Sequence, residues 1–397
     1  MLNSGSSSIK IDLIDIVAGG ESKIASGRVQ RSGNSAGATY RLGTAPEVEF
    51  LHERQDPALA LREFVAWVEA EAAKAKIPKL AVDAIGHRVV HGGVKLRKPA
   101  RIDESVLAEL DRVTPLAPLH NPPALAGIRA AQEVFGAATP NVAVFDTAFH
   151  STIPAEAATY ALPHALGEQH GIRKYGFHGI AHESLMQAYA AATGRSLAKS
   201  KLITLQLGQG CSATAIRNGE SIDTSMGFTP LEGLIMGTRP GDLDASIIPF
   251  LTGHGIVSPD QIGRWLNQEC GLKGVSGLSG DFTELWNARA TSDRAALAIG
   301  MFCYRIRKYV GAFMTTLGGA EAIIFGGGIG ENRPGIRSNV CRDMEWCGVK
   351  LDEAKNQSAV GQPSLISSND SLVQVWVLNA DESSMIARKT FALLNPG

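Results

Sequence analysis

The sequence predicts an α/β protein with two domains, and three observations lead to that fold class. At 397 residues the chain exceeds the size of one ordinary core, so two domains are expected. Short apolar runs typical of strands alternate along the chain with stretches that have helical spacing. A pattern of strand, small-residue turn and strand occurs at residues 2–8 and again, about half the chain later, at residues 207–213, as in a duplicated domain.

The first elements are a turn, a strand and a helix. Residues 3–10 read NSGSSSIK, and residues 9–16 alternate at first between apolar and polar positions, as a strand does. We therefore expect the small-residue turn to join two strands of a hairpin. Residues 59–72 place apolar side chains at i, i+3, i+4 and i+7, which predicts an amphipathic helix.

Later strands end in residues that can do chemistry. The predicted strands are 80–85, 141–145, 202–207, 323–325 and 373–377, and they lead into GHRVVHGG (86–93), Asp146, Gly208–Gly210, GGGIGEN (326–332) and NADE (379–382). A helix over 299–317 is expected to stop at Gly318, with Cys303 in its buried face. Because ligands bind beyond the carboxyl ends of strands in α/β sheets, we expect these tips to converge on one cleft.

Composition narrows the classes of partner and location. The net charge is −1, without blocks of like charge, so neither a nucleic-acid nor a membrane-surface partner is expected. Five cysteines without a C-x-x-C pair argue against a disulfide framework or a structural zinc site and fit a reducing compartment. No apolar run reaches the length of a membrane span, and the amino end does not resemble a signal peptide. We expect a cytoplasmic protein.

Three glycine and serine turns suggest phosphate binding, since the N–H groups of tight turns point into a concavity. They match neither the Walker A pattern nor G-x-G-x-x-G in the required setting. This leaves a rarer class, in which paired hairpins of two duplicated domains hold a nucleotide's phosphates. Magnesium is expected beside phosphates, and Asp146 and Glu382 are the best-placed carboxylates. Either one alone could instead be a solvated loop residue or a helix cap.

Two arginines and a histidine complete the candidate site. Arg88 and Arg239 stand in glycine-rich segments, where their guanidinium groups could clamp a small carboxylate and a phosphoryl group or form exposed salt bridges. His178 and His182 are four residues apart, but H-E-x-x-H is absent, so zinc is not expected. His178 is better interpreted as a hydrogen-bond donor at a turn-to-helix junction.

Taken together, seven segments resemble the signature segments of acetate kinases. In chain order they are NSGSSSIK, GHRVVHGG, PLAPLHNPP, FDTAFHSTIP, KYGFHG, GFTPLEGLIMGTRPGDLD and GGGIGEN. The resemblance runs from end to end of the chain.

The resemblance implies two duplicated ribonuclease-H-like α/β domains of the actin, sugar-kinase and chaperone-ATPase superfamily. Each domain would have a mixed five-stranded sheet, and the active site would lie between them. The expected domains are residues 1–147 with 383–397, and residues 148–382. The implied reaction is reversible phosphoryl transfer from ATP to acetate, giving acetyl phosphate and ADP, with Mg²⁺ or Mn²⁺, in a homodimer.

The resemblance also implies a role for individual residues. Arg88, Asp146, His178 and Arg239 would be catalytic, and Asn3 and Glu382 would serve the metal. The acyl site would comprise Arg88, Val90, Leu119, His120 and Pro230. The nucleotide site would comprise Ser6, Ser8, Lys10, Gly208, Gln209, Gly210, Asp281, Phe282, Thr283, Gly328 and Asn332.

This chain departs from the family pattern on the nucleotide side. Gln206 and Gln209 stand where the family usually has histidine and asparagine, and Thr283 stands where it carries an arginine. The family also has a few more apolar residues before Asn3, so a short first strand is expected. Two alternatives follow: a propionate or butyrate kinase, which would share nearly all of these residues, or a nucleotide-binding regulator on the same fold without catalysis.

Overall fold

The computed structural model describes residues 1–5, 8–17, 20–32, 35–52, 56–76 and 81–396. The chain divides into two compact units. Unit 1 is Met1–Ala148 with Asp381–Gly397, and unit 2 is Phe149–Ala380. The division predicted from the sequence lies one or two residues away at each junction and stays a prediction.

Unit 1 contains an eight-stranded sheet in the order β5-β4-β3-β2-β1-β6-β8-β7. Its elements are β1 (Leu2–Ser4), β2 (Ser8–Val17), β3 (Gly20–Ser32), β4 (Ser35–Leu42), β5 (Val48–His52), α1 (Pro57–Lys74), β6 (Ile85–Val89), β7 (Ala100–Arg101), α2 (Glu104–Val113), α3 (Asn121–Phe135), β8 (Asn141–Phe145) and α15 (Glu382–Leu394).

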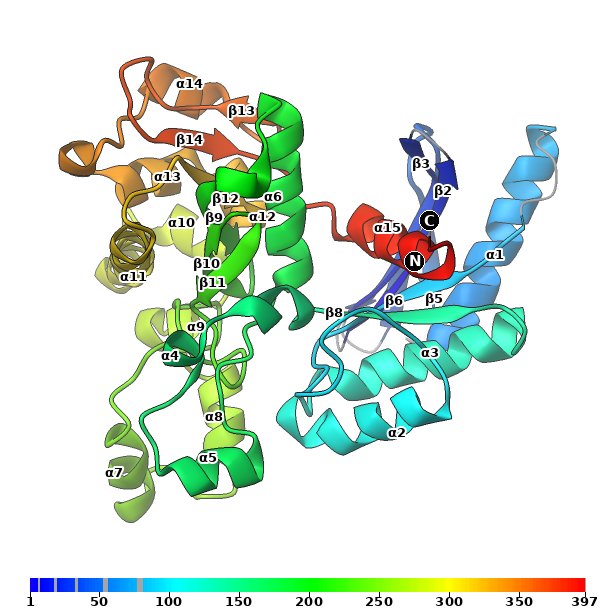
Figure 1. Ribbon diagram of the computed structural model, residues 1–397, viewed down its shortest axis with the longest axis horizontal. Coiled ribbons are helices and arrows are strands. Elements are labelled where there is room, and N and C mark those ends of the chain that lie inside the picture. The colour runs from blue at the N-terminus through cyan, green and yellow to red at the C-terminus, as the bar shows by residue number, and fades with distance from the viewer. Residues whose placement is uncertain (6–7, 18–19, 33–34, 53–55, 77–80, 397) are drawn as a thin grey trace. The chain divides into compact units, whose positions relative to one another are not determined.

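Helices α1 and α15 cover opposite faces of the unit 1 sheet (Figure 1). Ile85 of β6 packs in the core that contains Leu61 and Phe64 of α1. The next residue, Gly86, faces the other way: a β-carbon there would lie 2.7 Å from Ile386 of α15. Successive residues of a strand point to opposite faces, so the last helix of the chain closes the second face of the first unit.

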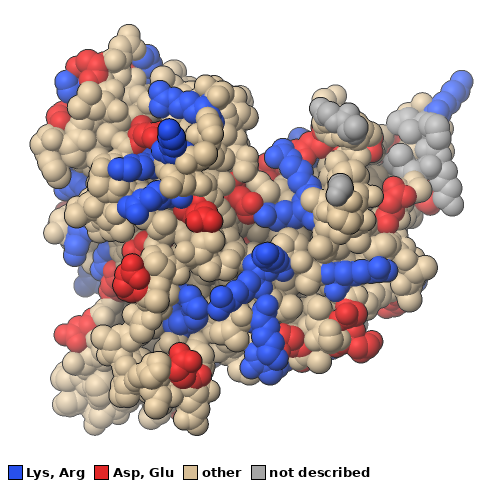
Figure 2. Space-filling view, in the orientation of Figure 1, with Lys and Arg blue, Asp and Glu red and all other residues tan. Residues whose placement is uncertain are grey.

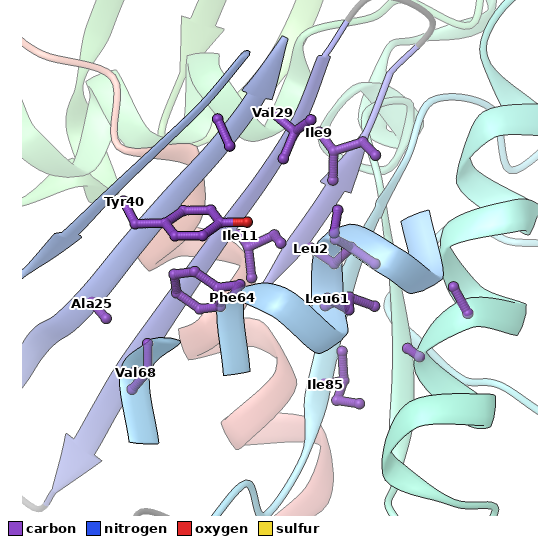
Figure 3. Packing of buried hydrophobic residues seen from close by; sticks show 14 residues of the cluster. Leu2, Ile9, Ile11, Ala25, Val29, Tyr40, Leu61, Phe64, Val68 and Ile85 are labelled. Atoms are coloured by element: carbon purple, nitrogen blue, oxygen red, sulfur yellow. The ribbon is translucent and has the colours of Figure 1, made fainter. Parts of the chain in front are cut away.

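The core of unit 1 follows the predicted apolar patterns (Figure 3). Phe64 and Val68 of α1 are buried against Ile11 and Tyr40 of the sheet. The helix predicted over 59–72 is confirmed as α1, which Asp56 caps by accepting a hydrogen bond from the Leu59 N–H at 2.8 Å.

Unit 2 contains a six-stranded sheet in the order β11-β10-β9-β12-β14-β13. Its elements are α4 (Ala155–Ala158), α5 (His164–His170), α6 (Gly179–Thr193), β9 (Lys201–Leu207), β10 (Cys211–Arg217), β11 (Glu220–Thr224), α7 (Ile247–Gly253), α8 (Ile262–Gln268), α9 (Gly271–Ser276), α10 (Phe282–Ala288), α11 (Asp293–Leu317), β12 (Ala322–Gly326), α12 (Gly327–Asn332), α13 (Pro334–Cys341), α14 (Glu353–Ser358), β13 (Ser364–Leu365) and β14 (Gln374–Val377).

The two sheets share one topology. In each, three antiparallel strands come first (β1, β2 and β3; β9, β10 and β11). The first of them pairs in parallel with the next strand (β6 or β12), which in turn pairs in parallel with a further one (β8 or β14). A short antiparallel strand, β7 or β13, ends each sheet. The α/β fold with duplicated mixed sheets is confirmed.

The predicted number of five strands per sheet is wrong. The shared five-stranded core gains β7 or β13 at one edge, and in unit 1 the antiparallel meander continues beyond β3 into β4 and β5. Neither short edge pairing leaves a periodic apolar pattern, which is why the sequence does not predict it.

Three local predictions need correction. The strand predicted over 80–85 begins only at Ile85 and continues to Val89; Leu80 lies outside the described residues. The glycine turn 326–332 is a strand end followed by the helix α12. The ungapped match of 2–8 with 207–213 is out of register, because Ser4 ends β1 whereas Leu207 ends β9.

The remaining strand and helix predictions are confirmed within a few residues. Helix α11 ends at Leu317, and Gly318 caps it with a φ of +65°, as predicted. Basic and acidic side chains both occur over each unit on the face drawn in Figure 2, in keeping with the near-zero net charge. No helix in the described part of the chain is long and apolar enough to cross a membrane.

Candidate active site

The site residues of unit 1 gather where three parallel strands end. Asn3 and Arg88 are each the second-last residue of their strands, β1 and β6, and Asp146 directly follows β8. Because parallel strands align their carboxyl ends at one edge, the topology brings these three residues to the same edge of the sheet.

Arg88 and Asp146 form a buried, two-pronged ion pair. Arg88 donates from Nε to Asp146 Oδ1 at 3.1 Å and from Nη2 to Oδ2 at 2.6 Å, and the Asp146 side chain is only 1% exposed. Glu382 lies 3.9 Å from Arg88 Nε. Although burial alone lowers the pKa of Arg88, the Asp146 and Glu382 carboxylates raise it above its ordinary value. Burial raises the pKa of Asp146 to about 6, and the guanidinium opposes that shift.

Glu382 reaches this cluster because α15 begins there. Asp381 caps the helix by accepting the Ser384 N–H at 3.0 Å, which places Glu382 in the first turn. Leu2 and Ser4 face α3, so Asn3 between them faces the α15 side of the sheet, as does Arg88. Two carboxylates and an amide oxygen are the hard oxygen donors that Mg²⁺ accepts when phosphates and water complete its shell. The donor chemistry fits the predicted metal, although the described residues contain no ready-made group of three acidic, histidine or cysteine ligands.

The segment around Arg88 is fixed by buried polar contacts. His87 bonds Asn141 Oδ1 at 2.7 Å, and burial lowers the pKa of His87 to about 4. The His91 backbone N–H donates to Asn121 Oδ1, and the Asn121 amide donates back to the His91 carbonyl, both at 3.1 Å. The first bond ties the strand carrying Arg88 to β8, and the other two tie the segment that follows this strand to the start of α3.

Unit 2 contributes a histidine at a strained position. His178 is the N-cap of α6 with φ of +57°, a region that non-glycine residues seldom adopt. A chain of hydrogen bonds holds its ring: His178 Nδ1 to Ser212 Oγ at 2.8 Å, Ser212 Oγ to His182 Nε2 at 2.7 Å, and His182 Nδ1 to Thr204 Oγ1 at 2.7 Å. Ser212, His182 and Thr204 are fully buried.

Arg239 lies beside His178, with Gly210 between them. A β-carbon on Gly210 would lie 3.1 Å from Arg239 Nη2 and 3.3 Å from His178 Nε2, so only glycine lets the turn approach both. Arg239 donates from Nη1 to the carbonyl of Pro230 at 2.6 Å. Burial lowers the pKa of Arg239, yet none of the described acidic side chains forms an ion pair with it. Arg239 and His178 together therefore offer a positive charge and hydrogen-bond donors.

The turn between β9 and β10 packs on the loop that carries Arg239. The Gly237 N–H donates to the Gln209 carbonyl at 3.2 Å, and a β-carbon on Gly237 would meet the Gln209 side chain at 2.9 Å. The Gly208 N–H bonds the Gly210 carbonyl at 3.1 Å, so the predicted hairpin turn is present. Gln206, the other changed residue, stands opposite Ser212 in the hairpin, and its Oε1 is buried without a hydrogen-bond partner.

The remaining predicted nucleotide residues of unit 2 lie at the start of α10 and within α12. Asp281 caps α10 by accepting the N–H groups of Thr283 and Glu284, at 2.8 and 3.0 Å. Thr283 Oγ1 accepts a hydrogen bond from Arg333 Nη2 at 2.7 Å. Arg333 follows Asn332 at the end of α12, so this bond brings the two predicted segments together. A guanidinium thus reaches the place where the family arginine is missing.

Helix α12 starts against the β9 strand. Gly327 has φ of +75°, and a β-carbon there would lie 2.5 Å from the Leu207 carbonyl oxygen. Glu331 accepts the Gly327 N–H at 2.9 Å and the Asn379 amide at 2.5 Å. Phe282 is a buried core residue stacked on Trp286, which argues for a packing role.

The predicted acyl residues divide between the units. Val90 lies two residues after Arg88 and directly before His91, and His120 lies directly before Asn121. The His91–Asn121 bonds therefore anchor both Val90 and His120 in unit 1. Leu119 is 45% exposed. Pro230 belongs to unit 2, where its carbonyl holds Arg239. Ser8 begins β2, Lys10 pairs with Asn3 across the hairpin, and Ser6 lies outside the described residues.

Sequence reasoning missed the residues that support the site. Ser212 and Thr204, which hold the two histidines, and Asp381, which starts α15, carried no motif of their own. Alternation along the predicted strand 202–207 puts Thr204 and Gln206 on one face, and this was the available signal. The predicted His178 at a turn-to-helix junction lies at such a junction.

Comparisons with known proteins agree along the whole chain. The model of the acetokinase family matches residues 1–388. The curated acetate kinase of Solibacter usitatus is 44% identical over 98% of this chain and 96% of its own length. The curated acetate kinase of Thermotoga maritima is 42% identical over 98% of this chain and 97% of its own length.

Solved structures show the same likeness. The crystal structure of Porphyromonas gingivalis acetate kinase has a TM-score of 0.88 at 36% identity, covering 99% of this chain and 98% of that one. A propionate kinase from Francisella tularensis also has a TM-score of 0.88 at 36% identity, covering 98% of both chains.

Proposed function

This chain belongs to the acetokinase family and has acetate kinase activity, and from that premise we propose how its residues perform the reaction. The observation that carries the proposal is the buried Arg88–Asp146 pair with Glu382 beside it, at the strand edge where α/β sheets bind ligands. The reaction is phosphoryl transfer from ATP to a carboxylate.

The reaction requires alignment of the reacting groups and neutralisation of the phosphoryl charge more than it requires a general base. A carboxylate oxygen is already a nucleophile at neutral pH, so no general base is required. The attacking and leaving oxygens lie in line across the phosphorus while charge develops on its three equatorial oxygens. We propose direct in-line transfer, in which protein cations hold the acceptor and stabilise those oxygens.

In unit 1, we assign Arg88 to the acceptor carboxylate, with the apolar side chains of Val90 and Leu119 toward its methyl group. Asp146 keeps the guanidinium oriented through two hydrogen bonds. Asn3, Asp146 and Glu382 would hold Mg²⁺ or Mn²⁺, which when bound neutralises phosphate charge. The oxygen donor set of this edge supports that assignment.

In unit 2, we assign Arg239 and His178 to the transferring phosphoryl group. Both flank Gly210, and His178 is fixed by its bond to Ser212 so that its Nε2 can donate to an equatorial oxygen. The Gln209 and Gly210 N–H groups of the turn would bind phosphate oxygens, because the Gly208 N–H is bonded to the Gly210 carbonyl. Gly328, Asn332 and the start of α10 would receive the nucleoside. Arg333 offers the positive charge that Thr283 does not.

Trapping the acyl phosphate with hydroxylamine tests the proposal. Purified protein with ATP, acetate and Mg²⁺ should form acetohydroxamate, and removal of the metal with a chelator should abolish product. ATP, GTP and pyrophosphate are compared as donors, because three nucleotide-side residues differ from the family. Folded protein that gives no product with any donor and acceptor would support the regulator without catalysis.

A propionate kinase is the second candidate, because the Francisella tularensis propionate kinase matches this structure as well as the acetate kinase from Porphyromonas gingivalis does. One methylene changes transition-state binding by about 1–3 kcal/mol. The ratio kcat/KM for acetate, propionate and butyrate, measured in the same trap, decides between them. The assignment as an acetate kinase predicts the highest kcat/KM for acetate.

We also propose a homodimer and a cytoplasmic location. Family membership supports both, and all five cysteines are free thiols in the structure, as expected of a reducing compartment. Light scattering coupled to size-exclusion chromatography measures the assembly, and a mass of one chain contradicts the dimer.

A further inference from the structure

The hydrogen-bond chain behind His178 ends at a threonine in the core of unit 2. Thr204 lies in β9 and is fully buried, and its Oγ1 is 2.7 Å from His182 Nδ1. Within the described part of the chain, this nitrogen is the only hydrogen-bond partner of the Thr204 hydroxyl. A buried hydroxyl proton without an acceptor is costly, because it has lost its hydrogen bonds to water. Thr204 therefore donates a hydrogen bond to His182 Nδ1.

The order of protons continues through the His182 ring. Burial lowers the pKa of His182 well below its ordinary value, so the ring is neutral and carries one N–H group. Because Nδ1 accepts a hydrogen bond from Thr204, the proton of this ring is on Nε2. Nε2 lies 2.7 Å from Ser212 Oγ, so His182 donates a hydrogen bond to the serine.

Ser212 connects this ring to His178. Its hydroxyl is fully buried, and its hydrogen-bond partners among the described residues are two ring nitrogens, His182 Nε2 at 2.7 Å and His178 Nδ1 at 2.8 Å. Since Ser212 accepts from His182, its own proton has His178 Nδ1 as the remaining acceptor. Nδ1 of His178 then carries no proton, and the neutral ring carries its proton on Nε2.

The reverse order of protons leaves one buried donor unpaired. His178 would then donate from Nδ1 to Ser212, and Ser212 would donate to His182 Nε2. His182 would donate from Nδ1 to Thr204, whose own proton would have no acceptor. A single buried donor without a partner makes the reverse order at least about fivefold less populated than the forward order.

The nitrogen that carries the proton in the forward order lies close to Arg239. A β-carbon on Gly210 would be 3.3 Å from His178 Nε2 and 3.1 Å from Arg239 Nη2. A ligand oxygen that approaches the guanidinium from this turn would therefore also approach the N–H group of His178. A neutral ring with its proton on Nε2 can donate there without carrying a positive charge.

We propose that this buried chain sets the order of protons, so that neutral His178 keeps its proton on Nε2 and offers that N–H group to the transferring phosphoryl group. The identity of the acceptor rests on the proposed function, whereas the order of protons does not. Thr204, His182 and Ser212 are fully buried and act through His178, so they are positioning residues.

His150 offers an internal reference in the same unit. Its Nε2 lies 3.0 Å from the Phe177 carbonyl oxygen, which can only accept a hydrogen bond. Its Nδ1 lies 2.9 Å from Ser221 Oγ. Burial lowers the pKa of His150 to about 4, so the ring is neutral. His150 therefore carries its proton on Nε2 whatever the order of protons beside Thr204.

Nitrogen-15 NMR of the full chain, labelled at histidine and free of substrates, tests the proposal. The method distinguishes a ring nitrogen that carries a proton from one that does not, and the signals that disappear in His178→Gln belong to His178. At about pH 8 we expect His178 to carry its proton on Nε2 and none on Nδ1, as His150 does. A major form of His178 with a proton on Nδ1, alone or together with Nε2, overturns the proposal.

Thr204→Val removes the hydroxyl that begins the chain and keeps the shape of the side chain. Either order of protons then leaves Nδ1 of His182 without a partner, so the preference for the forward order is lost. The ratio of the Nδ1–H form of His178 to its Nε2–H form should rise at least about fivefold. Thr204→Ser, which keeps a hydroxyl, should give the parent spectrum, and His150 should be unchanged in both variants. A His178 spectrum in Thr204→Val that equals the parent spectrum overturns the proposal.

Steady-state rates separate this proposal from the proposed function. Thr204→Val should have about half the kcat of Thr204→Ser, because only the Nε2–H form of His178 donates, and KM for acetate should be equal in the two variants. If the spectra show the forward order and its loss in Thr204→Val while kcat is equal, the order of protons is supported. The donor role assigned to His178 in the reaction then fails instead.

Discussion

The two units carry their key arginines in opposite electrostatic settings. In unit 1, Arg88 is matched by the buried Asp146 carboxylate and the nearby Glu382 before any substrate binds. In unit 2, Arg239 is held by a backbone carbonyl, and its neighbour His178 is held by the neutral hydroxyl of Ser212. The positive charge of Arg88 is thus compensated by carboxylates, whereas the charge of Arg239 is not.

The difference teaches that one fold can be tuned for two tasks. A guanidinium that is already paired with a carboxylate is held in one orientation, and its charge is largely neutralised by that partner. It therefore selects a small carboxylate by geometry. An uncompensated guanidinium attracts a multiply charged phosphoryl group and gains strength as charge develops. Four substitutions or conditions test whether this contrast holds.

The largest effect is expected at Arg239. Replacing Arg239 with alanine should lower kcat on the order of 100- to 1,000-fold, because it removes a cation from the developing charge. Stability should change little, since no buried acid loses a partner. Steady-state kinetics and thermal unfolding measure the two effects, with the exposed Arg264→Ala as control. A near-normal kcat would remove Arg239 from the mechanism.

Arg88→Ala should impair both activity and folding stability. We expect a comparable loss of kcat/KM, and a destabilisation of about 3 kcal/mol at pH 8, because Asp146 is left buried and unpaired. The pKa of Asp146 is already raised in the folded protein and rises further without Arg88, so the penalty grows as pH rises and shrinks as Asp146 is protonated. Arg62→Ala, which breaks an exposed pair in the same unit, is the control. A penalty that does not vary between pH 5.5 and 8 would contradict the compensated site.

Ser212→Ala should have a smaller effect, confined to unit 2. It removes the hydroxyl between His178 and His182, leaving ring nitrogens of two histidines without that partner. We expect kcat to fall about tenfold, whereas KM for acetate, which is assigned to Arg88, stays unchanged. A purely structural role would instead lower the fraction of active protein with both constants unaltered.

The smallest effect is expected from pH near neutrality. Burial lowers the pKa of His87 in unit 1 and of His150 in unit 2 to about 4. Both histidines stay neutral in the folded protein but become protonated in the unfolded chain as pH falls from 7 to 6. Each should therefore lower the free energy of unfolding by about 0.7 kcal/mol over that interval. In His87→Gln and His150→Gln that loss should be smaller by this amount. Equal slopes in variants and parent would show that these histidines titrate when folded.

The sequence predicted elements whose signal is local. Helix α1 and strand β8 were found because their apolar spacing lies within one segment, and Asp146 and Glu382 because they follow such strands. The duplication was visible as a repeated hairpin. Its true register was hidden, because the small residues of the two turns align better than their strand ends do.

Other features depend on contacts between distant segments. The edge strands β7 and β13 are two residues long, too short to show a period. The Ser212 bridge depends on a helix and a hairpin meeting, and neither sequence encodes that meeting locally. The bond from Arg333 to Thr283 likewise joins residues 50 apart. Such pairings arise from tertiary packing, which a single sequence does not display.

The closure of unit 1 by α15 has a consequence for synthesis on the ribosome. Residues 1–148 leave the exit tunnel first, but the helix that covers one face of their sheet is made last, after all of unit 2. At about 5–20 residues per second, the incomplete sheet waits on the order of 10–50 s for its final helix. During that interval the apolar face that will contact Ile386 is open to chaperones and to other nascent chains. The first domain to be translated is thus the last to be finished.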